Sequence, residues 1–484
     1  MNARNLRAPW RAGEPGALAG GRNPTATTSR DPCAYVRRRG AILIIAMWIM
    51  IVLAAMAMVM CHSMRVEIAC SGNELSAAQA QAVEAGAVQY VLAAVDSLKG
   101  QLPSETDFPC EAVRLGQGMF WIIRPDFDND RQRAYGIADE AGKLNLNTAT
   151  AAMLARLPEM TDELAAAIID WRDGDSTPAP NGAENEYYLS LKDPYQCKNA
   201  PLETVEELFL VNGATEDLLL GEDTNRNGLL DLYEDDGDAS QPPDNRDGQL
   251  RRGLLSMVTV YSRESNTDAG GKARVNINSA GGNTLRNAVT KGLDSSRATE
   301  VLVRTYAGRP FANVLDFYVR SGLKVEEFAA IADGLTTSDP GTPLQGLINV
   351  NTAPKGVLAC LPGLDDNDAA ALVAKRLDGG EALQTIAWVA QALTPAKAAA
   401  IGGLITVRTY RFSADIVSVS ADGRCPRRCR IVIDAASSPP RVMYRQDLTH
   451  LGWPLAGETL EHLQKGGSLD DLVAARTAVQ ETPK

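Results

Sequence analysis

The sequence predicts an α+β chain in which a long amino-terminal helix packs on an antiparallel sheet and a large helical domain is inserted between the strands. Three observations lead to this prediction: a long apolar segment that becomes amphipathic, β-type runs near both ends of the chain, and an internal repeat between them. With 484 residues, the chain is long enough for two or three hydrophobic cores.

The first predicted element is a single helix over residues 41–98. Twenty uncharged residues begin at Ala41, directly after three arginines and Gly40. A helix of that length rises roughly 30 Å, which is enough to cross the apolar core of a bilayer. From Leu75 onward, apolar residues recur at three- and four-residue spacing, which predicts an amphipathic second half. Because basic flanks stay in the cytoplasm, the rest of the chain is expected on the other side of the membrane.

Charge and cysteine content agree with an exported protein. The first 40 residues hold 8 arginines and 2 acidic residues, so the remainder has 40 basic and 58 acidic residues and a formal charge of −18. Such an acidic surface repels nucleic acid and favours cations. The eight cysteines show no metal-type spacing. Cys425 and Cys429 are compatible either with a small disulfide or with the tip of a hairpin.

Strands are predicted at both ends of the chain. Residues 119–126 and 133–139 form one predicted hairpin. Residues 410–420 alternate between polar and apolar, residues 430–434 pair with them, and residues 442–444 make a last strand. Together these segments are expected to build one sheet against the long helix, because everything between them is of another type.

The middle of the chain contains an internal repeat. The motif Leu-Asn-Leu-Asn-Thr-Ala at 144–149 recurs as Ile-Asn-Val-Asn-Thr-Ala at 348–353, an offset of 204 residues, and a looser copy begins at Val275. Each copy is interpreted as two helices joined by a short turn, capped by Asn or Thr. The copies are therefore predicted to be helix-hairpin-helix (SAM-like) repeats within a helical domain at residues 144–402.

Helix-hairpin-helix units often bind DNA through a glycine turn and basic side chains. Here Glu159 occupies the glycine position in the first copy, and Asp365 and Asp366 follow the turn in the last. Only the middle copy, at Lys291, has basic character. No nucleic acid is therefore expected as a partner, since phosphate contacts need Lys and Arg. A packing role for the repeats is favoured.

The amino-terminal pattern resembles that of type IV pilins and type II secretion pseudopilins. Basic residues, a glycine, and an apolar helix that turns amphipathic are typical of these families. The resemblance implies cleavage by prepilin peptidase between Gly40 and Ala41. Most members carry a glutamate at the fifth mature position, where this chain has Ile45. That difference is a feature of minor pseudopilin K, a subunit expected at the fibre tip.

The similarity to pseudopilin K extends over nearly the full length. It includes the Asn-x-Asn-Thr-Ala units and three further segments, residues 170–175, 180–188 and 206–208. It implies a pilin-like fold, an inner-membrane protein crossing once with its bulk in the periplasm, and partners comprising other minor pseudopilins and the secretion platform. The predicted organisation is a leader (1–40), a transmembrane and amphipathic helix (41–98), the first part of the sheet domain (99–143), the inserted helical domain (144–402), the remaining strands (403–455) and a tail (456–484).

One acidic loop has the spacing of a calcium site. Residues 223–234 place oxygen ligands at positions 1, 3, 5, 9 and 12 and a glycine at position 6. Calcium takes six to eight oxygen ligands, and this spacing wraps them around one ion. A solvated acidic linker is the alternative, although it would not need the glycine or the apolar eighth position. The predicted ligands are Asp223, Asn225, Asn227, the carbonyl of Leu229, Asp231 and Glu234.

A second metal site, at Asp173, Asp175, Glu184 and Glu186, is implied by the resemblance alone. The sequence shows no phosphate-binding loop or nucleophile elbow, and its three histidines lie outside metal or triad contexts. No enzyme activity is therefore expected. Besides a tip pseudopilin assisting export across the outer membrane, two alternatives stay open: a membrane-anchored DNA-uptake receptor and a calcium-dependent surface adhesin.

Overall fold

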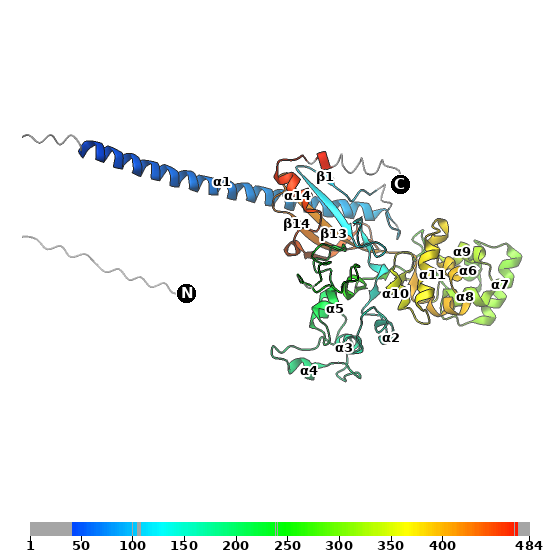
Figure 1. Cartoon of the computed structure of the whole chain (residues 1–484). Helices are drawn as coiled ribbons and strands as arrows, with labels where there is room; N and C mark the ends of the chain where they lie inside the picture. The colour runs from blue at the N-terminus through cyan, green and yellow to red at the C-terminus, as the bar shows by residue number, and fades with distance from the viewer. Residues whose placement is uncertain are drawn as a thin grey trace, which may run out of the picture. The chain divides into compact units, whose positions relative to one another are not determined.

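The structure is a computed structural model that describes residues 41–98, 100–103, 108–237, 239, 241–468 and 470–472. The chain divides into two compact units, residues 1–68 and 69–484. The described residues of the first unit belong to helix α1 (Ala41–Asp96), drawn in blue in Figure 1. Among the described residues, this helix is long and apolar enough to cross a membrane. The predicted helix is confirmed, and the predicted leader lies outside the described residues.

Both ends of the chain contribute to one antiparallel sheet in the second unit. The strand order is β1-β2-β13-β14-β15, with β3 also paired to β2 and β4 to β13. The predicted hairpin and the three carboxy-terminal strands are confirmed, whereas β1 was not predicted because three residues carry no usable alternation. The strands are β1 (Val113–Leu115), β2 (Gly118–Arg124), β3 (Ala134–Tyr135), β4 (Ala138–Asp139), β13 (Arg411–Ser420), β14 (Arg427–Asp434) and β15 (Arg441–Asp447).

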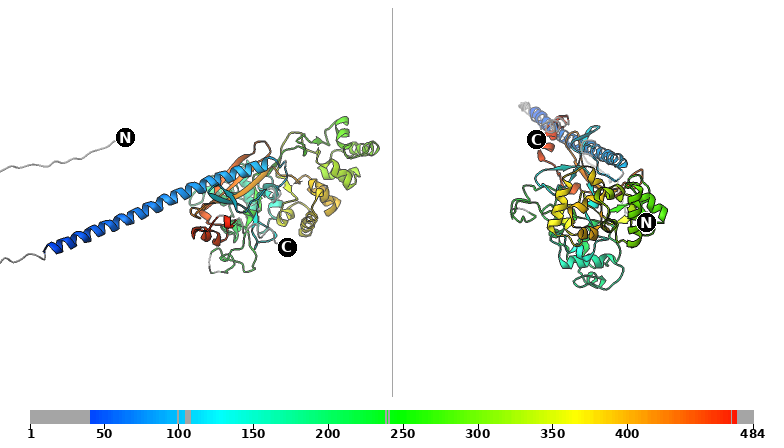
Figure 2. Two further views of the ribbon diagram at one scale, coloured as in Figure 1. Left: turned by 90° about the horizontal axis from the view of Figure 1, so that it is seen from above. Right: turned by 90° about the vertical axis from the view of Figure 1, so that its right-hand side faces the viewer.

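Different segments of the chain cover the two faces of the sheet. Phe120 and Ile122 pack with Val83 and neighbouring apolar residues of α1 on one face. Side chains alternate along a strand, so Trp121 points to the opposite face, where it packs with Leu463 of α14 (Gly457–Gln464). Part of the segment predicted as a tail therefore belongs to the core. Figure 2 shows the second half of α1 lying along the strands.

The hairpin between β13 and β14 settles the alternatives for its cysteines. Cys425 lies in the turn and Cys429 is buried in β14, and both are free thiols. Cys429 pairs in register with Ile416 on β13. The interpretation as a hairpin tip is therefore confirmed, and the two thiols are not joined.

Three short parallel ladders close the three copies of the repeat. In each copy the opening Asn-containing strand pairs with a strand that follows the helices of that copy. Each copy is thus a closed unit, with both ends held at one place. The paired strands are β5 (Leu144–Asn145) with β6 (Val258–Thr259), β8 (Val275–Asn276) with β9 (Leu335–Thr336), and β11 (Ile348–Asn349) with β12 (Ile405–Thr406).

The second asparagine of each motif ties the opening strand to a later segment. Asn147 Nδ2 donates to the Leu202 carbonyl at 2.9 Å, and the Leu202 amide donates back to Asn147 Oδ1 at 2.8 Å. Asn278 makes the same pair of bonds with Phe311. Asn351 donates to the Leu383 carbonyl. The asparagine that recurs in the sequence therefore donates an equivalent hydrogen bond in each copy.

Helices fill the space between these strands. A large shared core runs through all three copies and includes Leu154, Leu285 and Leu358, each 0% exposed. Each copy opens with two consecutive helices, while the helix-hairpin-helix assignment itself stays a prediction. The α-helices are α2 (Ala151–Leu154), α3 (Asp162–Arg172), α4 (Asn185–Leu189), α5 (Glu216–Leu220), α6 (Gly282–Val289), α7 (Ser295–Gly308), α8 (Val314–Ser321), α9 (Val325–Ala332), α10 (Lys355–Ala359), α11 (Asp366–Arg376), α12 (Val389–Ala392) and α13 (Pro395–Ile401).

Shorter elements complete the described chain. They are β7 (Arg263–Glu264), which pairs antiparallel with β10 (Leu344–Gln345), and six 3₁₀ turns among the described residues. The turns are η1 (Glu140–Gly142), η2 (Val205–Leu210), η3 (Leu254–Ser256), η4 (Glu381–Gln384), η5 (Ile386–Trp388) and η6 (Thr449–Leu451).

Candidate metal centres

The predicted calcium loop, residues 223–234, follows α5 and folds back on itself. The Asp223 carboxylate accepts hydrogen bonds from the amides of Asn227 at 2.9 Å and Gly228 at 3.1 Å. Gly228 has a φ of +74°, the left-handed conformation that a glycine adopts without strain. Asp223 is 7% exposed, so the first carboxylate of the motif lies inside the turn rather than in solvent.

The remaining predicted ligands converge on the same turn. Asn225 Nδ2 and Asn227 Nδ2 donate to Asp231 Oδ2 at 2.7 and 2.9 Å. Glu234 is fully buried, and its Oε2 accepts from the Asp231 amide at 3.0 Å. Glu234 Oε1 is buried without a hydrogen-bond partner in the described part of the chain. A buried carboxylate oxygen costs free energy unless something compensates it, and a cation would do so.

Electrostatics inside the loop favour a cation. Burial raises the pKa of Asp223 to about 6. Burial also raises the pKa of Glu234 to about 8, and the charges of Asp223 and Asp231 add to that rise. A divalent cation would offset both the burial and the repulsion. The residues present therefore fit calcium, which prefers carboxylate and amide oxygens.

The structure places the side chains of five of the six predicted ligands in one hydrogen-bonded turn. For Leu229 it shows only the main-chain amide, which donates to Asn227 Oδ1 at 2.7 Å. The predicted use of the Leu229 carbonyl stays a prediction. The twelve-residue spacing was a sufficient signal for this grouping, because all five side chains come from one continuous segment. Calcium binding by the loop stays a prediction.

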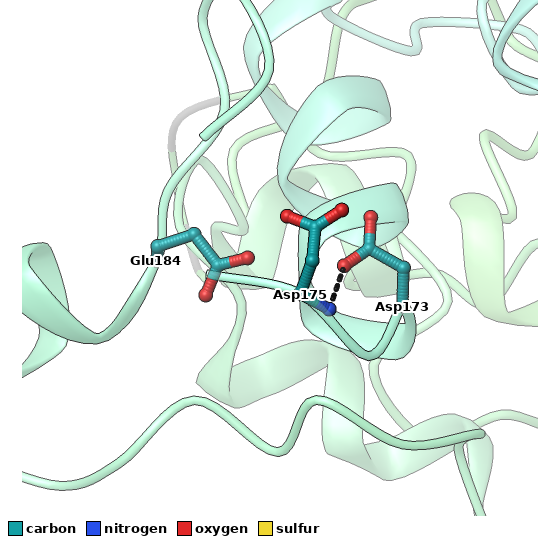
Figure 3. A group of neighbouring side chains, drawn as sticks. All are labelled: Asp173, Asp175 and Glu184. Carbon is teal, nitrogen blue, oxygen red and sulfur yellow. Dashed lines mark hydrogen bonds between the residues drawn. The ribbon is translucent and has the colours of Figure 1, made fainter. Parts of the chain in front are cut away.

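A second group of carboxylates lies between α3 and α4. Oxygens of Asp173, Asp175 and Glu184 lie within 4.8 Å of one another. Figure 3 shows the Glu184 carboxylate directed toward the two aspartates, and the Asp175 amide donating to Asp173 Oδ1 at 3.4 Å. Glu184 is 4% exposed, and neither of its oxygens has a hydrogen-bond partner among the described residues. Burial, with the charges of Asp170 and Asp173, raises the pKa of Glu184. This group also fits a hard cation.

The fourth residue predicted for this group, Glu186, is not part of it. Glu186 is an exposed residue in the first turn of α4. Sequence reasoning missed Asp170, which is 1% exposed and accepts a hydrogen bond from the Ala179 amide, so that it shapes the loop between Asp175 and Glu184. A Cβ on Gly182 would lie 1.9 Å from Asp170 Oδ2, which explains the glycine there.

The predicted processing site lies at the edge of the described residues. Ala41 is the first residue of α1, and Gly40 lies outside the described residues. Cleavage between them stays a prediction.

Comparisons with known proteins identify two segments of this chain. Residues 138–220 and 348–408 match two family models, both described as type II secretion system (T2SS), protein K. These two segments are similar to the type II secretion system protein K family. The first matched segment contains the carboxylate group around Glu184, whereas the loop 223–234 lies between the two segments.

Two curated relatives carry the same protein K description. The type II secretion system protein K of Pectobacterium carotovorum subsp. carotovorum is 39% identical over 69 residues, which are 14% of this chain and 21% of the relative. That of Klebsiella pneumoniae is 45% identical over 51 residues, 10% of this chain and 16% of the relative. Each match therefore spans about a fifth or less of the relative's length.

One solved structure is also similar. It is the crystal structure of the GspK-GspI-GspJ complex from the enterotoxigenic Escherichia coli type 2 secretion system. The alignment covers 78% of this chain and 98% of the other chain, at 14% identity and a TM-score of 0.39.

Proposed function

We propose that this chain is a minor pseudopilin of a type II secretion system, acting at the tip of the pseudopilus in protein export across the outer membrane. One observation carries the proposal: two segments that match protein K models follow an apolar helix, with which the described part of the chain begins. An anchor helix that continues into a sheet suits a subunit held in a membrane while its folded part assembles with others. Its role is structural, and no enzyme activity is proposed.

The anchor is proposed to cross the inner membrane once, with the bulk of the chain in the periplasm. Prepilin peptidase would remove residues 1–40 by cleaving after Gly40. Replacing Gly40 by leucine should leave the leader attached, because a bulky side chain blocks the peptidase. The mass of the protein purified from membranes, compared with wild type and with a Ile45→Val control, tests this. A wild-type mass that still includes residues 1–40 would contradict cleavage at this bond, and removal of the leader from Gly40→Leu as well would show that the peptidase does not depend on this glycine.

Calcium is proposed as the ion of both metal centres. The support is the buried unpartnered oxygens of Glu234 and Glu184. The charges of Asp223 and Asp231 act on Glu234, and Glu184 has an oxygen within 4.8 Å of oxygens of Asp173 and Asp175. The chemistry that calcium would supply is charge neutralisation that orders two acidic loops. Calorimetric titration of the full chain should find calcium binding that weakens in Asp223→Asn and in Glu184→Gln. Glu381→Gln, an exposed carboxylate in η4, is the matched control. Unchanged binding in both ligand variants would refute the assignment.

The proposed partners are other minor pseudopilins and the secretion platform. Residues 144–402 would form a helical crown too wide to be buried along a packed fibre, which favours a place at its end. Co-purification of the full chain with tagged minor pseudopilins tests this assembly. A solitary protein that mediates calcium-dependent adhesion would favour the adhesin alternative instead.

Duplex DNA is not proposed as a partner. In the first repeat the turn position that would face a phosphate holds Glu159, which pairs with Arg251 at 3.0 Å. A carboxylate at that position repels phosphate. Salt-sensitive binding of duplex DNA by the full chain would overturn this part of the proposal and favour an uptake receptor.

A further inference from the structure

The backbone of the calcium loop is held by an arginine from the distant sheet. Arg428 of β14 donates from Nη1 to the Asn225 carbonyl at 2.6 Å and from Nη2 to the Arg226 carbonyl at 2.7 Å. Arg428 is 1% exposed, although it carries a charge. Positions 3 and 4 of the loop are therefore fixed by a residue about 200 positions away in sequence.

Asp415 of β13 fixes the orientation of that arginine. Arg428 Nε and Nη2 donate to the two carboxylate oxygens of Asp415 at 2.8 and 2.7 Å. A guanidinium bound at its edge by a carboxylate and at its tips by two carbonyls has little freedom to move. Arg430 also donates to Asp415, at 3.1 Å. In the described part of the chain, Arg430 makes no hydrogen bond to the loop.

The connection between β2 and β3 holds the other side of the loop. The Leu230 amide donates to the Asp130 carbonyl at 2.9 Å. Arg252 donates to the carbonyls of Asp126 and Gly228. Gly228 approaches so closely that a Cβ there would lie 2.9 Å from Pro125 Cα. The loop is therefore hydrogen-bonded both to β14 and to the connection between β2 and β3.

The loop itself belongs to the helical insertion. It follows α5 directly, and Leu219 of α5 is fully buried in the core shared by the helical copies. The same twelve residues are therefore continuous with the helical insertion and hydrogen-bonded to the sheet. Any ion that orders them acts on the junction between the two.

We propose that Arg428 is a positioning residue for the calcium loop, and that calcium bound there holds the helical insertion against the sheet. The inference rests on calcium binding as proposed above. With the carbonyls of Asn225 and Arg226 directed at Arg428, the side chains of Asn225 and Asn227 stay within the turn, so less ordering is needed when the ion binds. By thermodynamic linkage, if calcium binds more tightly when the loop is hydrogen-bonded to the sheet, bound calcium also stabilises those hydrogen bonds.

The first test compares two arginine variants in the full chain in detergent. Arg428→Lys keeps the charge but cannot bridge Asp415 and two carbonyls, whereas Arg430→Lys is the matched control on the same carboxylate. Arg428→Lys should weaken calcium binding about tenfold in calorimetric titration, a loss of about 1.4 kcal/mol. Arg430→Lys should change it less than threefold. Equal losses of calcium affinity in the two variants would overturn the positioning role of Arg428, because both substitutions would then act only through their shared partner Asp415.

The second test measures hydrogen exchange with calcium and with chelator. In the wild type, calcium should slow exchange both in residues 223–234 and in the sheet segments 125–130 and 427–434. Binding without slower exchange in the sheet segments would refute the junction while leaving the calcium site standing. No calcium binding by the wild type would refute both proposals. Should Arg428→Lys fail to fold, Arg252→Lys tests the same junction at a partly exposed position. Unchanged slowing of exchange by calcium in segment 125–130 of this variant would refute a role of Arg252 in holding the loop.

Discussion

A buried carboxylate on α1 should decide how firmly that helix holds the sheet. Glu84 is 1% exposed and pairs with Arg427 of β14 at 2.5 Å and with Arg445 of β15. Val83 and Ala87 beside it pack on the same sheet face. Replacing Glu84 by alanine removes the polar part of this contact and leaves the apolar part in place.

The size of the effect follows from the two arginines. A hydrogen bond to a charged group contributes about 1.5–3 kcal/mol, so two contribute at most about 6 kcal/mol. The side chains of Arg427 and Arg445 are 30% and 53% exposed, so water recovers part of that when the carboxylate is gone. We expect Glu84→Ala to lower the free energy of opening this part of α1 by about 2–4 kcal/mol, less than for a fully buried pair.

Hydrogen exchange of the full chain in detergent measures this opening. Amides between Ser76 and Val95 should exchange roughly 30- to 800-fold faster in Glu84→Ala than in wild type. Glu74→Ala, an exposed carboxylate on the same helix, is the control and should leave exchange unchanged. Wild-type exchange rates in Glu84→Ala would show that apolar packing alone holds the helix, and the reasoning would fail.

The same contact predicts a dependence on pH. Burial acts to raise the pKa of Glu84, but the hydrogen bonds from Arg427 and Arg445 outweigh it and leave the pKa below the ordinary 4.5. A carboxyl whose pKa is lowered on folding stabilises the fold fully above its unfolded pKa and less as pH falls through the folded value. The opening of α1 should therefore become easier below about pH 4.5. Glu84→Gln should flatten that dependence.

Three further predictions concern the repeats and the second metal centre. Leu154→Ala and Leu358→Ala remove equivalent fully buried side chains. Each should lower the free energy of unfolding by about 2–5 kcal/mol, measured by calorimetric unfolding. A near-zero loss for either variant would contradict their equivalence. Asn147→Ala should destabilise more than Asn351→Ala in the same assay, because Asn147 both donates to and accepts from its partner segment. Glu184→Gln should lower the calcium content of the purified chain measured by mass spectrometry, and an unchanged content would place the ion elsewhere.

The sequence by itself determined the elements whose signal is local. Twenty uncharged residues after Gly40, the apolar run Phe120–Ile123 and the alternation before Ser420 each predicted the type of element that the structure shows. The grouping of polar side chains in residues 223–234 was equally readable, since all of them lie within twelve consecutive residues. The 204-residue offset revealed the copies without any knowledge of their contacts.

Only the tertiary structure decided which distant segments meet. β2 pairs with β13 in the register Ile122 to Ile416, and α14 fills the second face of the sheet through Leu463. Arg428 donates to the backbone of the loop 223–234 across about 200 residues, and Glu186 is exposed and is not part of the group it was expected to join. A periodic pattern records that a face is buried but not what buries it. The partner is selected when the whole chain closes around its cores.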